Sequence, residues 1–186
     1  MRAESRSVIV EDSVTGDNLK VNSDGAIYNS DIVSKWLEEG KVYVASDNAS
    51  FGGTTFEDKI LFRNPASSGK TVIILGFRVH LDLAATTNQL NQINVRFHKN
   101  PTVSANGTGV GEFNLNNGAA DAAVALVTTE PTVSPRGDKL GEGIAINQSY
   151  TSVFPYLMVE DSSLLIRVKM NDAANSIIYT VGWAEI

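Results

Sequence analysis

Hydrophobic and polar residues alternate along several stretches of this chain. Between Phe77 and Leu83 every second residue is apolar, and the same period of two recurs in residues 92–98, 166–170 and 177–183. Such alternation places one row of side chains on a core and the opposite row on solvent or a partner. Shorter apolar stretches predict further strands at residues 8–10, 41–45, 59–63, 71–75, 123–127, 143–146 and 154–159. The pattern, rich in β-branched residues and turn sequences, predicts an all-β fold, an antiparallel β-sandwich or jelly roll.

One short helix is predicted just before the first long strand. Ser30 or Asp31 can cap its N-terminus, and Gly40 can end it. Glu38 and Glu39 near its C-terminus oppose the helix dipole. We therefore expect a short helix that depends on the packing of Trp36.

Three segments lack a regular pattern: residues 1–30, 99–122 and 128–142. Residues 1–30 contain too few apolar side chains for a core of their own, so we expect an N-terminal arm with the short helix over residues 1–40. The β-sandwich domain is then expected over residues 41–186. Long irregular loops in a compact domain usually belong to binding surfaces or extended contacts.

The length, charge and apolar content of the chain limit the kinds of molecule that it can bind. A length of 186 residues fits one domain with an arm. The 15 basic and 21 acidic residues give a net charge of −6, which argues against a nucleic-acid partner. No apolar run approaches the roughly 18 residues of a membrane span, and Met1 to Arg6 lack the apolar core of a secretory leader. We expect a soluble chain that binds neither nucleic acid nor membrane.

A nucleotide-binding motif is suggested by Gly69-Lys70-Thr71, the end of a phosphate-binding loop. Pro65 supplies no N–H group to a phosphate, and residues 72–75 have the pattern of a strand where such a site requires a helix. A strand–turn–strand hairpin is the better interpretation of residues 64–71.

The two histidines lie on the polar rows of two alternating segments. If residues 77–83 and 92–98 pair as an antiparallel hairpin, with Leu83 opposite Ile93, these rows share one face. A divalent metal on that face is one interpretation. Two guanidinium groups nearby oppose a cation, so a subunit contact is favoured and no metal site is expected. The predicted subunit-interface residues are Arg78, His80, Asp82, Arg96 and His98.

No catalytic constellation is recognisable. The chain has two histidines and no cysteine, which excludes a thiolate nucleophile, a disulfide framework and Cys-bound metals. The paired carboxylates Glu57-Asp58 and Glu160-Asp161 fall at expected turns, where charge usually faces solvent. We therefore expect no enzyme, no catalytic residues and no cofactor. Carboxylates that converge in a groove, as in a glycan hydrolase, would be needed for the enzymatic alternative.

Three strings of residues resemble structural proteins of tailed bacteriophages: the segment from Thr15 to Gly25, then Tyr43-Val44-Ala45-Ser46, then Leu61-Phe62-Arg63-Asn64-Pro65 with Ser68-Gly69-Lys70. The resemblance covers mostly residues 8–80. It implies a small virion protein, commonly a trimeric β-sandwich that decorates and cements the capsid or forms a head or tail appendage. No catalytic residue is carried over, because these proteins have no catalytic motif.

The resemblance and the residue pattern together predict a capsid decoration or cement protein, assembled in the host cytoplasm and located in the virion. We expect it to form a homotrimer through the sandwich and to bind the major capsid protein or another virion protein through its arm. Apolar and aromatic side chains dominate interface energy. The predicted partner-binding residues are therefore Val8, Ile9, Val10, Leu19, Val21, Ile27, Tyr28 and Trp36.

The alternative function is an adhesin of a tail or head fibre that binds a host receptor or glycan. Its contacts would come from the loops at residues 99–122 and 128–142. These loops contain a single aromatic residue, Phe113. Sugar-binding sites generally use an aromatic platform, which makes this function the second choice.

Overall fold

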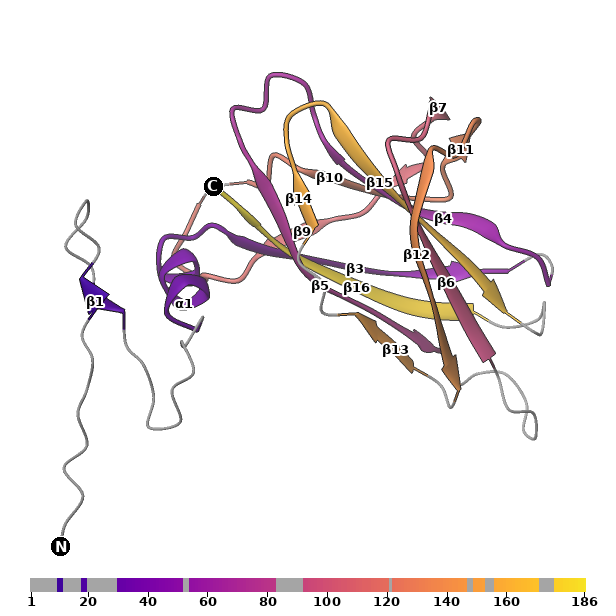
Figure 1. The fold of residues 1–186 in the computed structure, drawn as a ribbon, viewed down its shortest axis with the longest axis horizontal. Coiled ribbons are helices and arrows are strands. Elements are labelled where there is room, and N and C mark those ends of the chain that lie inside the picture. Colours follow the sequence, from indigo (N-terminus) through magenta and orange to yellow (C-terminus); the bar gives the residue numbers. More distant parts are fainter. Residues whose placement is uncertain are drawn as a thin grey trace, which may run out of the picture.

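The chain folds into two antiparallel β-sheets packed face to face, as the computed structural model in Figure 1 shows. The structure describes residues 10–11, 18–19, 30–51, 54–82, 92–120, 122–146, 149–152, 156–170 and 176–186. The predicted all-β sandwich with one short helix is therefore confirmed.

The first sheet has six strands. Their order is β12 (Asp138–Ile146), β6 (Gln92–Lys99), β15 (Ser162–Met170), β4 (Glu57–Asn64), β10 (Leu126–Thr129) and β8 (Thr108–Gly109).

The second sheet has the order β13 (Ser149–Ser152), β5 (Val72–Leu81), β16 (Ser176–Glu185), β3 (Val42–Ser50) and β9 (Glu112–Asn114), with β14 (Tyr156–Met158) also paired to β5. Two small ribbons complete the structure: β1 (Val10–Glu11) with β2 (Asn18–Leu19), and β7 (Val103–Ala105) with β11 (Thr132–Val133).

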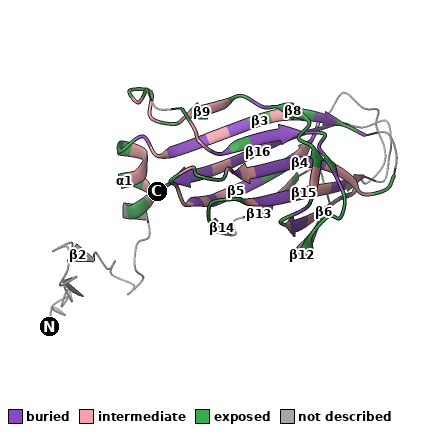
Figure 2. Cartoon of the chain, turned by 90° about the horizontal axis from the view of Figure 1, so that it is seen from above, coloured by how far each residue is buried: buried purple, intermediate pink, exposed green. Residues whose placement is uncertain are grey.

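The core lies between the two sheets and is built from the apolar rows that the alternation predicts. Figure 2 shows these buried stretches along the central strands. Trp183 is fully buried; it packs edge-on against Phe62, with ring centroids 5.0 Å apart, and stacks on Tyr43 at 5.9 Å. The same rows of β5, β6, β15 and β16 are buried as expected, so the period of two assigned the inward face correctly in all four strands.

The predicted helix is α1 (Ser30–Glu38), which lies at one end of the sandwich and leads into β3. Gly40 ends it with a left-handed φ of +69°. A Cβ atom at this position would come within 2.6 Å of the Ala119 Cβ, so the site requires glycine for space as well as for conformation. Trp36 is half-buried.

A second, small core lies on the outer face of the first sheet. Leu61 and Leu165 point outward from β4 and β15, and Val133 and Val103 of the β7–β11 ribbon cover them. The segments 99–122 and 128–142 were expected to be irregular, and that expectation is wrong in part. They contain β7, β8, β9, β11 and the start of β12, because their short strands pair with each other or with a sheet edge.

Two expected hairpins are absent. Residues 64–71 do connect two strands, but β4 belongs to the first sheet and β5 to the second, so the turn crosses between sheets. The segments 77–83 and 92–98 do not pair either, because β5 pairs with β16 and β6 pairs with β15. In both cases a strand from the C-terminal part of the chain takes the place expected for the sequence neighbour.

The strand expected at 123–127 begins later, at Leu126 of β10. The backbone N–H groups of Val124 and Ala125 donate instead to the buried carboxylate of Glu185. A side chain therefore takes the acceptor role that a neighbouring strand would otherwise have.

Candidate functional site

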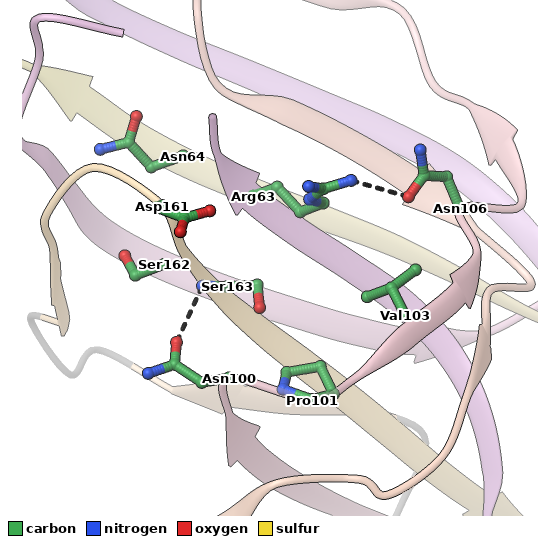
Figure 3. Close-up of a pocket in the computed structure, with 9 residues that line it drawn as sticks. All are labelled: Arg63, Asn64, Asn100, Pro101, Val103, Asn106, Asp161, Ser162 and Ser163. Carbon is green, nitrogen blue, oxygen red and sulfur yellow. Dashed lines mark hydrogen bonds between the residues drawn. The ribbon is translucent and has the colours of Figure 1, made fainter. Parts of the chain in front are cut away.

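A polar pocket of about 240 Å³ opens on the outer face of the first sheet, beside the β7–β11 ribbon (Figure 3). It is lined by nine residues from three stretches of the chain: Arg63, Asn64, Asn100, Pro101, Val103, Asn106, Asp161, Ser162 and Ser163. We call it the polar pocket.

Strand ends and turns hold the polar side chains of this pocket in place. Asn100 follows β6 and Asp161 precedes β15, and both adopt left-handed backbone conformations, with φ of +49° and +57°. Asn and Asp tolerate this region better than other side chains. The Asn100 N–H donates to the Ser163 carbonyl at 2.8 Å, and the Ser163 N–H donates to Asn100 Oδ1 at 3.1 Å. These two bonds fix the turn after β6 to the start of β15.

The charged and amide groups of the pocket are only partly used within the chain. Arg63 Nη1 donates to Asn106 Oδ1 at 2.8 Å. Asn64 donates through Nδ2 to the carbonyls of Lys70 and Met158, while its buried Oδ1 finds no donor among the described residues. Asp161 is the one acidic residue among the nine. A single carboxylate gives no pair for general acid–base chemistry, so the pocket is equipped for hydrogen bonding.

The five predicted subunit-interface residues do not form one polar face. Arg78 and His80 lie on β5 and Asp82 directly follows it, whereas Arg96 and His98 lie on β6 in the other sheet. The expectation of a shared patch is wrong, since the hairpin on which it depended does not form.

Arg96 is engaged within its own chain. Its guanidinium lies 3.7 Å from the centroid of the Phe56 ring and pairs with Glu142 on β12, with Nε 2.9 Å from Oε2. Arg96 and Lys139 lower the pKa of the Glu142 carboxyl to about 2. Nearby, Asp58 pairs with both Arg167 and Arg136, at 2.6 and 3.0 Å. These contacts tie the segment before β12 to the outer face of the sheet.

His98 is covered rather than presented to a partner. It is 9% exposed, and its Nδ1 lies 3.4 Å from the carbonyl oxygen of Gly137. Burial lowers the pKa of His98 below its ordinary value. The side chain therefore tends to remain neutral beneath the turn at Gly137.

The three residues of the second sheet differ from one another in exposure. Arg78 is exposed on the outer face, whereas His80 is half-buried and its Nδ1 has no hydrogen-bond partner within the described part of the chain. Asp82 Oδ2 accepts a hydrogen bond from the Ser176 hydroxyl at 3.1 Å. Of the five predicted interface residues, Arg78 is the exposed one.

The predicted partner-binding residues lie mostly outside the described residues: Val8, Ile9, Val21, Ile27 and Tyr28. Val10 and Leu19 are opposite each other in the β1–β2 ribbon. Trp36 is on α1 and keeps part of its surface exposed.

An apolar groove of about 370 Å³ lies between α1 and the outer face of the second sheet. Its apolar walls include Val33 and Leu37 of α1, Val44 and Leu75 of the sheet, and Leu115 after β9. We call it the apolar groove. Phe113 is opposite Val44 in the strand register and is 66% exposed, so it extends this apolar surface along β9. The sequence had grouped Phe113 and Leu115 with a loop and gave no indication that they adjoin the helix.

Two further features concern ligands and membranes. Within the described ranges, no three His, Cys, Asp or Glu side chains gather as a metal site would require. The helix that the structure describes is not long and apolar enough to span a membrane.

The chain matches no protein-family model, and no curated protein matches it in sequence.

Proposed function

We propose that this chain is a non-catalytic structural protein of a phage virion, a capsid decoration or cement protein. It binds the head surface through its N-terminal arm, residues 1–40, and self-associates as a homotrimer through the β-sandwich. The observation that carries the proposal is the apolar groove: α1, the last part of the arm, lines it together with the outer face of the second sheet, beside the exposed Leu115.

The exposed apolar side chains at this end support a contact surface. Phe113, Leu115 and Ile32 are 66%, 50% and 49% exposed, respectively. Contiguous exposed apolar surface on a soluble domain generally marks an interaction site. Covering large apolar side chains at a partner surface contributes most of the energy in typical interfaces.

The order of the long strands favours the jelly-roll form of the sandwich. The strands β3, β4, β5 and β6 alternate between the two sheets, and β12, β13, β15 and β16 pair beside them in the order β12-β6-β15-β4 and β13-β5-β16-β3. Jelly rolls occur in viral capsid proteins and in lectins. Because one fold serves many functions, the strand order supports the structural role only together with the contact surfaces.

Self-association is assigned to the outer face of the second sheet, including the apolar groove, which Arg78, Thr151 and Thr180 help to line. Arg96 and His98 are engaged within the chain, which leaves Arg78 as the exposed member of the predicted set. Its neighbours on this face include the hydroxyls of Thr151 and Thr180. A surface with few charges and many hydrogen-bonding groups suits a close contact between copies.

The experiment deletes residues 2–29 and measures co-sedimentation with phage heads that lack the protein. We expect the shortened chain to keep the circular dichroism and urea midpoint of the full chain and to lose binding to heads. Leu115→Ser at the apolar groove should weaken self-association at least tenfold, whereas the matched control Ile144→Ser, on β12 of the first sheet, should leave it unchanged. Full occupancy of heads by the shortened chain would show that the arm is not the attachment.

Light scattering after gel filtration tests the homotrimer. We expect a mass of three times the 20.0 kDa of one chain, and loss of the trimer on Arg78→Glu. A single-chain mass at the concentrations used for head binding would contradict self-association.

A further inference from the structure

We propose that the polar pocket binds a single sugar residue through hydrogen bonds to its neighbouring hydroxyl groups. This inference goes beyond the structural role in the virion and does not depend on it. Four of its residues, Asn100, Pro101, Val103 and Asn106, lie in the segment 99–122, which the alternative adhesin function also assigns to a receptor or glycan.

The volume of the pocket sets the size of its ligand. About 240 Å³ is below the roughly 300–1,000 Å³ of pockets that hold drug-sized molecules. One sugar ring fits this volume, whereas a nucleotide or a fused ring system exceeds it. A longer glycan would therefore enter by one residue only.

The chemistry of the lining selects a neutral ligand with many hydroxyl groups. Arg63 supplies a guanidinium and Asp161 a carboxylate, on neighbouring sides of the pocket in Figure 3. The carboxylate would repel an anionic ligand, and the guanidinium would repel a cationic one. A hydroxyl group donates and accepts at once, so a pair of adjacent hydroxyls can bond to both groups. Asn100 and Asn106 add amide N–H groups, whose oxygens are already occupied within the chain.

The polar side chains of the pocket are held in place before any ligand binds. The Asn100 side chain is fixed by the Ser163 N–H, and Arg63 is held by Asn106. Polar groups that are already in position lose little freedom when a ligand arrives. Pro101 and Val103 supply the apolar wall against which a sugar C–H face can pack. Without an aromatic platform among the nine residues, we expect a dissociation constant on the order of 1 mM.

The test is a two-dimensional amide NMR titration of the full chain with glucose, galactose, mannose and N-acetylglucosamine, each to about 50 mM, well above the expected constant. At least one sugar should shift the amide signals of Asn100, Asn106 and Ser163 with saturation. Cyclohexanol, which has the ring but a single hydroxyl, should not. Inorganic phosphate is the probe for an anion site.

The variants Arg63→Gln and Asp161→Asn test the residues themselves. Each keeps a polar side chain, and Asn tolerates the left-handed φ at position 161, so both should fold. We expect each to weaken sugar binding at least tenfold. The matched controls, Lys169→Gln at the far end of β15 and Asp47→Asn on the other sheet, should bind within twofold of the unchanged chain.

Three results would overturn the proposal: no sugar in the panel shifts these signals, the two pocket variants bind as well as the controls, or phosphate shifts the same signals with equal affinity. None of these outcomes concerns attachment to phage heads. A failed sugar site and a failed decoration role are therefore separate results.

Discussion

The buried carboxylate of Glu185 offers the sharpest test of how this sandwich is held together. Glu185 is 2% exposed, near the end of the last strand. Its Oε1 accepts hydrogen bonds from the N–H groups of Val124 and Ala125 and from Trp183 Nε1, at 2.9, 2.8 and 3.0 Å. It thereby fixes the segment before β10 to the C-terminal strand. We predict that Glu185→Ala destabilises the protein strongly.

The magnitude follows from the three donors. Hydrogen bonds to a charged group contribute about 1.5–3 kcal/mol each, and a buried donor left without an acceptor costs about 1–3 kcal/mol. Since Ala125 and Trp183 are fully buried, solvent reaches their donors poorly. Allowing for relaxation and for water entry near Val124, we expect Glu185→Ala to lower the free energy of unfolding by roughly 3–5 kcal/mol.

Glu185→Gln separates the acceptor from the charge. All three donors use Oε1, and only Val124 also reaches Oε2, at 3.0 Å. A glutamine with its oxygen in the Oε1 position therefore keeps three bonds, and it places an N–H group against the Val124 N–H. The expected cost is about 1–2 kcal/mol, well below that of alanine.

Urea unfolding, followed by circular dichroism at one fixed protein concentration, measures these differences. The concentration is fixed because self-association would add to the apparent stability. Glu38→Ala, at the exposed C-terminal turn of α1, is the control and should change stability by less than about 0.5 kcal/mol. If Glu185→Ala costs no more than Glu185→Gln, the three hydrogen bonds do not anchor the segment.

Three further predictions concern ionisable groups of the first sheet. Lys59 is 2% exposed, and its ammonium group pairs with the more exposed carboxylates of Glu57 and Glu130, both at 2.7 Å. Lys59→Ala should cost about 3 kcal/mol in the same urea assay, and a neutral result would contradict a stabilising role for these two pairs. The pKa of His98 is lower in the folded state than the ordinary histidine value of 6.5, so the unfolded chain binds more protons. The contribution of the neutral His98 to stability is therefore complete above pH 6.5 and declines as the pH falls below that value. His98→Gln should therefore show a smaller loss of urea stability between about pH 7 and pH 5 than the unchanged chain does, and identical pH profiles would be evidence against the burial of a neutral imidazole. Glu142 has its pKa lowered from 4.5 to about 2, so its contribution is present above pH 4.5 and is lost as pH falls toward 2. Arg96→Gln should raise that pKa toward 4.5 in a carboxyl carbon NMR titration, and a pKa that stays near 2 would leave Lys139 as the sole cause.

Buried charges show a limit of prediction from the sequence. Lys59 and Glu185 stand in strands, where charged residues usually face solvent. Each is buried because it meets partners from distant segments: the carboxylate of Glu130 for Lys59, and the amides at 124 and 125 for Glu185. No spacing of residues in the sequence indicates these contacts, because they depend on which strands are neighbours in the folded sheets.

The polar pocket shows the same limit. Its residues come from the end of β4, from residues 100–106 between β6 and β8, and from the turn and first residues of β15, which are adjacent only once the first sheet has formed. The sequence identified residues 99–122 as a candidate binding segment and Glu160-Asp161 as turn carboxylates. It could not show that these two regions line one pocket with Arg63.

The residue pattern was enough to predict the long strands, their inward faces, the short helix and its end at Gly40, but not the short strands β7, β8, β9 and β11. These are local properties: side-chain alternation, capping residues and backbone conformation act within a few residues of one another. The tertiary structure alone decided the pairing of strands. Residues 77–83 and 92–98 have compatible patterns, yet each pairs with a strand of the C-terminal part, because alternation fixes the face of a strand and not its neighbour. Pairing depends on how both sheets bury their apolar faces together, and that is a property of the whole chain.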